Sequence, residues 1–190
     1  MALFPGGRKF HGSTLVLPGE YKVTLTADGN SYSQTFQVKM DPREKVSDKV
    51  LNDQLKLALK IWNTASDQFQ IQTALESLSK SLSSIQKADK PDDKISTAAD
   101  DLKTKINSLR SLLASNGIAG LEGAVMSADR EPTKAMYEAF DIRSKNTKLA
   151  EDQWKKIKSE DLPKLNELLK GSGILLIKIP TDKAEHYLIP

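Results

Sequence analysis

The chain has 190 residues, of which 38% are hydrophobic, a formal net charge of +3 and no cysteine. The lack of cysteine excludes disulfides, thiolate metal sites and cysteine nucleophiles, and the small charge, spread along the sequence, gives no indication of nucleic-acid binding. No stretch approaches the roughly 20 apolar residues of a membrane span, and residues 1–10 lack the apolar core of a secretory signal. We therefore expect a globular chain without membrane insertion.

Residues 20–40 are predicted to form a β-hairpin, because apolar residues occupy alternate positions on both sides of Asp28-Gly29. An Asp-Gly pair tolerates the positive φ angles that a tight hairpin turn needs. The β-branched and aromatic content of the two runs suits a half-buried sheet. The alternating apolar residues are Tyr21, Val23, Leu25, Tyr32, Phe36, Val38 and Met40.

One face of this hairpin is apolar, and two or three strands do not make a stable sheet alone. Residues 13–17 are a candidate for a further strand before Pro18-Gly19. Three different elements could pack against the apolar face. They are strands outside this sequence, the adjacent helices, and the same hairpin of another copy of the chain.

From Ser47 the apolar period changes to three or four residues, which predicts a helix over residues 47–88. At about 1.5 Å per residue such a helix is roughly 60 Å long, so it must pack against other helices throughout. Lys90-Pro91 interrupts it, with Pro91 expected in the first turn of the next helix. The predicted apolar stripe consists of Leu55, Leu59, Trp62, Ala65, Phe69, Gln72, Leu75, Leu78, Leu82 and Ile85.

A second helix is predicted to end at Asn116-Gly117, because glycine suits a left-handed C-terminal cap. The short connection across Pro91 makes the first two helices antiparallel neighbours. Residues 117–130 are expected to form a short buried helix or a packed loop. The residues expected to be buried are Ile95, Ala98, Leu102, Ile106, Leu109 and Leu113 in the second helix, then Ile118, Leu121, Val125 and Met126.

Pro132 is predicted to open a third helix, and Ser159 to cap a short fourth one that stops at residues 171–173. Residues 174–180 are apolar enough to dock on the bundle. Order is expected to fade before His186, although Tyr187, Leu188 and Ile189 could anchor the end. The expected apolar positions are Met136, Phe140, Ala150, Trp154, Ile157, Leu162, Leu165 and Leu168, and the wetter side of the third helix carries Lys145, Lys148, Lys155, Lys156 and Lys158.

The sequence contains the passages LPGEYKVTLTADGNSYSQTFQVKMDPR and NGIAGLEGAVMSADREPT, the second followed by DLPKLNELLK. Together these passages resemble the C-terminal region of large bacterial proteins that carry sortilin-like β-propellers. Those propellers are often described as bacterial neuraminidase repeats or as glycosyl hydrolases. The resemblance runs from about Leu15 to about Gly173. Its fixed points are Pro18, Gly19, Tyr21, Gly29, Met40, Asp41, Pro42, Arg43, Asp129, Pro132 and Thr133.

The resemblance implies a domain boundary after residue 41. Residues 1–41 would be the β-hairpin segment of an incomplete immunoglobulin-like domain, and residues 42–190 a helical bundle with a C-terminal tail. The expected fold class is α+β, mainly α, with an antiparallel hairpin followed by a long antiparallel bundle of three to four helices. The Ser-x-Asp-x-Gly-x-x-Trp repeat of the propeller does not occur in this sequence, so no activity of a propeller is transferred to it.

No catalytic, cofactor-binding or metal-binding residue is predicted. The two histidines, His11 and His186, lie far apart in segments expected to be exposed or frayed, which does not favour a triad or a metal site. Paired carboxylates occur in first helical turns or on outer faces, where stabilisation of helix ends explains them better than acid–base catalysis. These pairs are Asp92-Asp93, Asp100-Asp101 and Glu160-Asp161.

Two further patterns have both a functional and a structural interpretation. Gly117, Gly120 and Gly123 have a spacing that could cradle a phosphate, but a cap or a close-packed helix contact is favoured because no strand precedes them. Trp62 and Trp154 could stack on sugars if they were exposed. Both lie on apolar stripes, which favours core packing.

We therefore expect a non-catalytic C-terminal accessory module of a secreted or envelope-associated propeller protein, serving as a spacer or a protein-interaction surface. Its expected partners are the N-terminal propeller of the parent chain, a second copy through the hairpin edge, or a glycan. The alternative is a carbohydrate-binding module. Tyr21, Tyr32 and Phe36 on one open face would favour glycan binding, whereas helices covering them would favour the spacer. An independent hydrolase would need a polar cleft with converging carboxylates.

Overall fold

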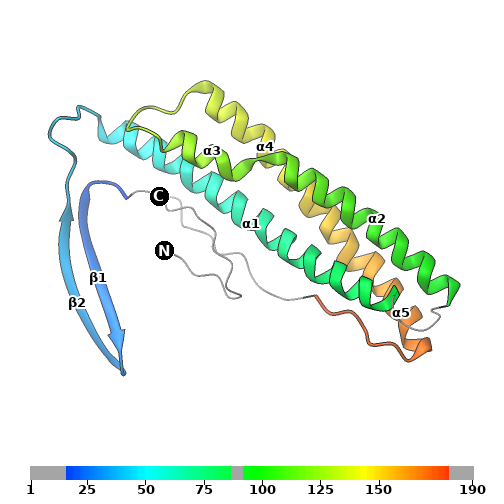
Figure 1. The fold of residues 1–190 in the computed structure, drawn as a ribbon. Helices are drawn as coiled ribbons and strands as arrows, with labels where there is room; N and C mark the ends of the chain where they lie inside the picture. The colour runs from blue at the N-terminus through cyan, green and yellow to red at the C-terminus, as the bar shows by residue number, and fades with distance from the viewer. Residues whose placement is uncertain (1–15, 87–91, 180–190) are drawn as a thin grey trace.

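A computed structural model describes residues 16–86 and 92–179, which form a β-hairpin at one end of a long bundle of helices (Figure 1). The fold is therefore α+β and mainly α, as the sequence predicts. No helix in these two ranges combines the length and the apolar character that a membrane crossing requires. The elements are β1 (Gly19–Ala27), β2 (Asn30–Val38), α1 (Asp48–Gln86), α2 (Asp93–Asn116), α3 (Ile118–Val125), α4 (Lys134–Lys156), the π-helix η1 (Ile157–Asp161) and α5 (Leu162–Ser172).

Strands β1 and β2 pair antiparallel from Gly19 opposite Val38 to Ala27 opposite Asn30. The turn between them has φ angles of 50° at Asp28 and 79° at Gly29, which confirms the role predicted for this pair. The candidate strand at residues 13–17 lies partly outside the described residues. Its described part, Val16 and Leu17, is not in a strand.

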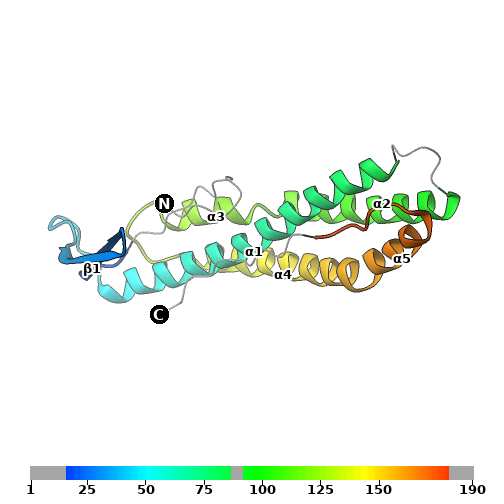
Figure 2. The same ribbon diagram turned by 90° about the horizontal axis from the view of Figure 1, so that it is seen from below.

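Helix α1 has 39 residues and contacts α2, α3 and α4 along its length (Figures 1 and 2). It begins after Ser47, whose hydroxyl accepts a hydrogen bond from the Val50 N–H at 3.4 Å. Because α1 contacts three other helices, buried residues occupy more of its circumference than the single apolar stripe predicted from the sequence. The stripe omits Leu51, Leu57, Ala58, Ile61, Ile71 and Ala74, all of which are buried, while Leu55, Phe69 and Gln72 are only half-buried.

Helix α2 returns antiparallel to α1, as expected (Figure 1). Its N-cap is Asp92, whose side chain accepts a hydrogen bond from the Lys94 N–H at 2.9 Å. Pro91 lies outside the described residues. The cap at the other end is Gly117 with φ of 58°, also as predicted. The buried alanine on this helix is Ala99 and not Ala98, which is half-buried.

Helices α4 and α5 are joined through η1 without a break, so the prediction that Ser159 caps a separate helix is wrong. Pro163 lies in the first turn of α5. It has no N–H to donate and its ring would clash with the carbonyl four residues earlier, at Ser159. A π-turn widens the helix at that point, which accommodates the proline without ending the helix. Leu169 is buried in α5, whereas Leu168, predicted to be buried, is 37% exposed.

The core consists of two apolar clusters along the bundle. One joins the second half of α1 to α2, α4 and α5, and the other joins the first half of α1 to α3. The tail docks on the first cluster, as predicted, with Ile177 only 6% exposed. The Asn166 side chain holds this residue in place. Its amide donates to the Ile177 carbonyl at 3.0 Å and its oxygen accepts from the Ile177 N–H at 2.9 Å.

Candidate functional site

One face of the hairpin gathers apolar side chains, which we call the hairpin apolar face. The register places Tyr21 opposite Phe36 and Leu25 opposite Tyr32, with Val23 between them. Because side chains alternate across a strand, these five residues project to the same side of the sheet. Val23 is 55% exposed, Leu25 65%, Tyr32 64% and Phe36 50%. The hairpin apolar face is therefore open.

The opposite face of the hairpin is polar and internally bonded. Thr24 and Ser33 share a hydrogen bond of 2.8 Å between their hydroxyls, and Thr26 and Ser31 share one of 2.9 Å. Cross-strand hydroxyl pairs of this kind stabilise a solvent-facing sheet surface. The two faces of the hairpin therefore differ in polarity, and only the apolar one would gain stability from packing against another surface.

The adjacent helices do not cover the hairpin apolar face. The hairpin projects beyond the start of α1 and meets it only at its base (Figure 1). There Gly19, Val38 and Met40 line a groove of about 480 Å³ together with Leu51 and Asn52 of α1. Of the three covers considered from the sequence, the helices are thus ruled out for the described residues.

The chain leaves the hairpin through a compact turn at Asp41. Its carboxylate accepts hydrogen bonds from the Arg43 backbone N–H at 2.9 Å and from the Arg43 guanidinium at 2.6 Å. The hydrogen bond from the guanidinium, and after it the one from the backbone N–H, lowers the pKa of Asp41. The bond between the two side chains raises the pKa of Arg43. The turn directs the chain from the sheet toward α1.

The carboxylate pairs named from the sequence lie at separate places. Asp92 caps α2, Asp100 and Asp101 are exposed on α2, and Asp161 forms an ion pair of 2.7 Å with Lys105. The hydrogen bond that the Lys105 ammonium donates to the Asp161 carboxylate raises the pKa of Lys105. Within residues 16–86 and 92–179, no group of three or more histidine or carboxylate side chains is placed to hold a metal ion.

Both histidines, His11 and His186, lie outside the described residues. The two tryptophans are in the core, since Trp62 is 2% exposed and Trp154 is 7% exposed. This confirms core packing over sugar stacking for both of them.

The glycine interpretation is confirmed only in part. Gly117 is a cap, but no atom lies within 4 Å of where a Cβ would stand on Gly120 or Gly123, so neither makes a close-packed helix contact. All five lysines expected on the wetter side of α4 are exposed, as predicted.

A set of buried polar side chains was not predicted from the sequence. Gln68 donates to the Leu113 carbonyl at 2.7 Å, and Gln54, two heptads earlier on α1, donates to the Val125 and Ala128 carbonyls at 2.7 Å. Asn116, expected only as part of a cap, bonds to both α1 and α4. Gln54 and Gln68 each come directly before a position of the predicted apolar stripe, Leu55 and Phe69, and this is the sequence signal that could have indicated them.

No protein-family model, no curated protein and no solved structure matches this chain. The hairpin apolar face is the feature from which we infer a function. It is an exposed apolar surface on a hairpin whose strands are paired along their whole length.

Proposed function

We propose that this chain is a non-catalytic accessory module whose hairpin apolar face is a protein-interaction surface and whose helical bundle is a rigid spacer. The single observation that carries the proposal is the open face formed by Val23, Leu25, Tyr32 and Phe36. An exposed apolar patch on an otherwise polar sheet is typical of an interaction site.

The bundle suits the role of a spacer. Helix α1 alone has 39 residues, which at about 1.5 Å each makes a rod of roughly 58 Å. Its apolar side chains pack against α2, α3 and α4 and are not available to a ligand. The hairpin stands at one end of this rod (Figure 1). A partner bound there would be held at a fixed distance from whatever contacts the far end.

The resemblance to propeller proteins supplies a candidate partner. In that family immunoglobulin-like strands precede the PGxYxVxLxxxG hairpin, and such strands would present an apolar face of their own. Sheets that pack face to face bury their inner side chains about 10 Å apart. We therefore propose the β-sheet region of a secreted or envelope-associated parent protein as the partner of the hairpin apolar face.

Carbohydrate binding is the second candidate, and one observation favours it. Tyr32 and Phe36 are exposed on the same face as the half-buried Tyr21, and the Tyr21 and Phe36 rings are 6.0 Å apart between centroids and tilted by 30°. Aromatic rings can stack on sugars. However, Val23 and Leu25 lie on the same face and are each more than half exposed. Aliphatic side chains are buried more effectively against an apolar protein surface than against a hydroxyl-rich sugar. Protein interaction is therefore the leading proposal.

The two candidates are separated by comparing two variants of the hairpin apolar face. Val23→Thr with Leu25→Thr removes the aliphatic side chains, and Tyr32→Thr with Phe36→Thr removes aromatic ones. A protein interface is expected to be weakened by both variants, because both remove apolar area, whereas glycan binding would be lost only with the aromatic pair. The readouts are binding of a hydrophobic dye and binding to a glycan array.

The matched control for these variants is Thr24→Ser with Thr26→Ser, on the polar face of β1. Far-UV circular dichroism should give the same helix content and the same unfolding midpoint for all variants, because the hairpin apolar face contributes nothing to the bundle core. Specific glycan binding that survives the aliphatic variant and disappears with the aromatic one would overturn the leading proposal.

Self-association of the isolated chain is also expected. The outer edges of β1 and β2 have no strand partner among the described residues, and a free edge beside an open apolar face favours pairing with a second copy. Size-exclusion chromatography with light scattering should show a dimer at high protein concentration, and the Val23→Thr, Leu25→Thr variant should shift it toward monomer. A species of 21.0 kDa at every concentration would contradict self-association.

A further inference from the structure

The hairpin has two outer edges, and its turn and register determine which backbone groups each edge presents. Both turn residues, Asp28 and Gly29, have positive φ angles, which is the geometry of a type I′ turn. The residues that flank such a turn exchange hydrogen bonds, and along antiparallel strands such pairs alternate with pairs that do not. The N–H and C=O groups of every second residue therefore point outward. These residues are Glu20, Lys22, Thr24 and Thr26 on β1, and Ser31, Ser33, Thr35 and Gln37 on β2.

The outer edge of β1 is protected against pairing with another strand, and that of β2 is not. Charged side chains, lysine above all, disfavour pairing at an edge strand, and β1 carries Glu20 and Lys22. Strand β2 has no charged residue and no proline, and its continuous register with β1 contains no bulge. Its residues from Asn30 to Gln37 are exposed, and among the described residues it pairs with β1 alone. The β2 edge is therefore the one that can accept a further strand.

We propose that β2 pairs antiparallel with β2 of a second copy of this chain, which forms a four-stranded sheet with a β1 strand at each edge. A two-stranded hairpin is only marginally stable, whereas three or more strands with an apolar face form a stable sheet. Two copies supply these strands without a further protein. This inference rests on the proposed function, because the paired sheet presents two hairpin apolar faces side by side as one interaction surface.

The length of β2 selects one register for this pairing. The strand runs over nine residues from Asn30 to Val38, so Gln34 is its centre. A two-fold axis at Gln34 pairs all nine residues, and every shifted register pairs fewer. Ser33 then lies opposite Thr35 of the second copy. Both residues belong to the outward-facing set, so the pair exchanges two hydrogen bonds.

This register also suits the side chains and the charges. Side chains alternate across the sheet, so Tyr32 comes beside Phe36 of the second copy on the apolar face, and cross-strand aromatic pairs are stabilising. Counted on from the strand end, the exposed Lys39 comes opposite Gly29 of the second copy, next to its exposed Asp28. The two-fold axis produces this attraction between opposite charges twice. The two edges are thus complementary in charge as well as in backbone hydrogen bonding.

Disulfide trapping tests the pairing, because the sequence contains no cysteine. In the proposed register, residue 34 of the two copies forms a pair without mutual hydrogen bonds, with the Cα atoms about 4.5 Å apart. A disulfide requires about 4.4–6.8 Å. The matched control for Gln34→Cys is Val23→Cys, which lies directly opposite on β1. We expect a covalent dimer to form at least about tenfold faster with Gln34→Cys, measured by non-reducing electrophoresis during mild oxidation.

Single cysteines at the neighbouring positions of β2 locate the two-fold axis. These variants are Tyr32→Cys, Ser33→Cys, Thr35→Cys and Phe36→Cys. The rate should be highest at residue 34, since at each other position the two sulfur atoms are offset along the strands. A maximum at another position would overturn the register. A rate for Gln34→Cys no higher than that for Val23→Cys would overturn the pairing through β2.

Proline variants test the same edge at equilibrium. Thr35 and Lys22 lie opposite each other in the hairpin, and the outward N–H of each is lost on substitution by proline without a loss of bonding between β1 and β2. Thr35→Pro removes two hydrogen bonds from the dimer and should raise its dissociation constant about tenfold or more. Lys22→Pro should leave it within about twofold. Sedimentation equilibrium measures both, and an equal rise would contradict the proposal.

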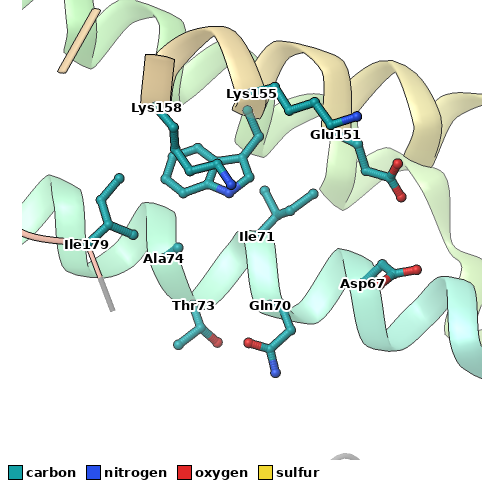
Figure 3. Close-up of a pocket in the computed structure, with 10 residues that line it drawn as sticks. Asp67, Gln70, Ile71, Thr73, Ala74, Glu151, Lys155, Lys158 and Ile179 are labelled. Atoms are coloured by element: carbon teal, nitrogen blue, oxygen red, sulfur yellow. The ribbon is translucent and has the colours of Figure 1, made fainter. Parts of the chain in front are cut away.

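Tryptophan fluorescence checks the helical bundle in every variant, because both tryptophans lie outside the hairpin. Trp62 is 2% exposed in α1. Trp154 lines a groove of about 420 Å³ between α1 and α4, together with Ile71 and Lys158 (Figure 3). An unchanged emission spectrum therefore shows that a lost dimer is not the result of an unfolded bundle.

Failure of this inference is distinguishable from failure of the proposed function. Thr35→Pro leaves the hairpin apolar face unaltered, so it should bind a hydrophobic dye as the original chain does. Dye binding that is lost with Tyr32→Thr and Phe36→Thr, without trapping at Gln34→Cys, would support the proposed function and overturn the pairing. Trapping at Gln34→Cys with dye binding unaffected by Tyr32→Thr and Phe36→Thr would support the pairing and overturn the proposed function.

Discussion

Replacing Trp62 by alanine is expected to destabilise the protein by about 3–5 kcal/mol. Trp62 lies in α1 and is 2% exposed, which makes it one of the largest fully buried side chains among the described residues. A buried tryptophan removes about 150–250 Å² from water, and its truncation leaves a cavity that a close-packed bundle fills only in part. Urea unfolding followed by far-UV circular dichroism measures the loss directly.

The control for Trp62→Ala is Ile142→Ala, which removes a large apolar side chain from a position that is 63% exposed on α4. It is expected to change the free energy of unfolding by less than about 0.5 kcal/mol. If Trp62→Ala does not fold, Trp62→Phe keeps a ring in the core and is expected to lose less. An effect of Trp62→Ala no larger than that of the control would show that Trp62 is not a core residue.

Replacing Asn116 by alanine is expected to cost about 1–3 kcal/mol, although it removes only a short polar side chain. The Asn116 amide donates to the Gln68 side-chain oxygen at 3.2 Å, to the Thr147 hydroxyl at 2.9 Å and to the Arg143 carbonyl at 2.9 Å. Asn116, Gln68 and Thr147 are all buried. Without Asn116, these acceptors lose a hydrogen-bond donor in a buried environment where water does not replace it. The loss lowers the free energy of unfolding.

Asn107→Ala on the exposed side of α2 is the matched control and is expected to be neutral or slightly stabilising, because alanine is the better helix former. Thr147→Val tests the mechanism in a double-mutant cycle with Asn116→Ala. The two changes should be non-additive by about 0.5–3 kcal/mol, since they remove the two ends of one hydrogen bond. Additive losses would mean that the hydrogen bond between Asn116 and Thr147 does not contribute to stability.

Several of the predictions that the structure confirms depend only on a few neighbouring residues. The alternation of apolar residues around Asp28-Gly29 was sufficient to predict the hairpin, because the turn and the side-chain period are local properties. The C-terminal cap of α2 at Gly117 follows equally from local chemistry. Even the grouping of Tyr21, Tyr32 and Phe36 on one face could be predicted, since alternation alone places them there.

The predictions that failed depend on what surrounds each element. A single stripe on α1 omitted Leu57, Ala58 and Ile61, because the sequence does not show that three helices contact α1 from different sides. The π-turn before Pro163 was not predicted either. A proline normally ends a helix, and here the packing of α4 and α5 on the same core keeps the helix continuous.

By itself, the sequence determined the hairpin with its turn and the helical ranges of α1 and α2, because these depend on backbone geometry and on side chains within a few residues. Only the tertiary structure decided which apolar surfaces were used. It drew Gln54, Gln68 and Asn116 into the core, and it left the hairpin apolar face open. The reason is physical: the burial of a side chain depends on elements distant in sequence, and no local pattern specifies how those elements are placed.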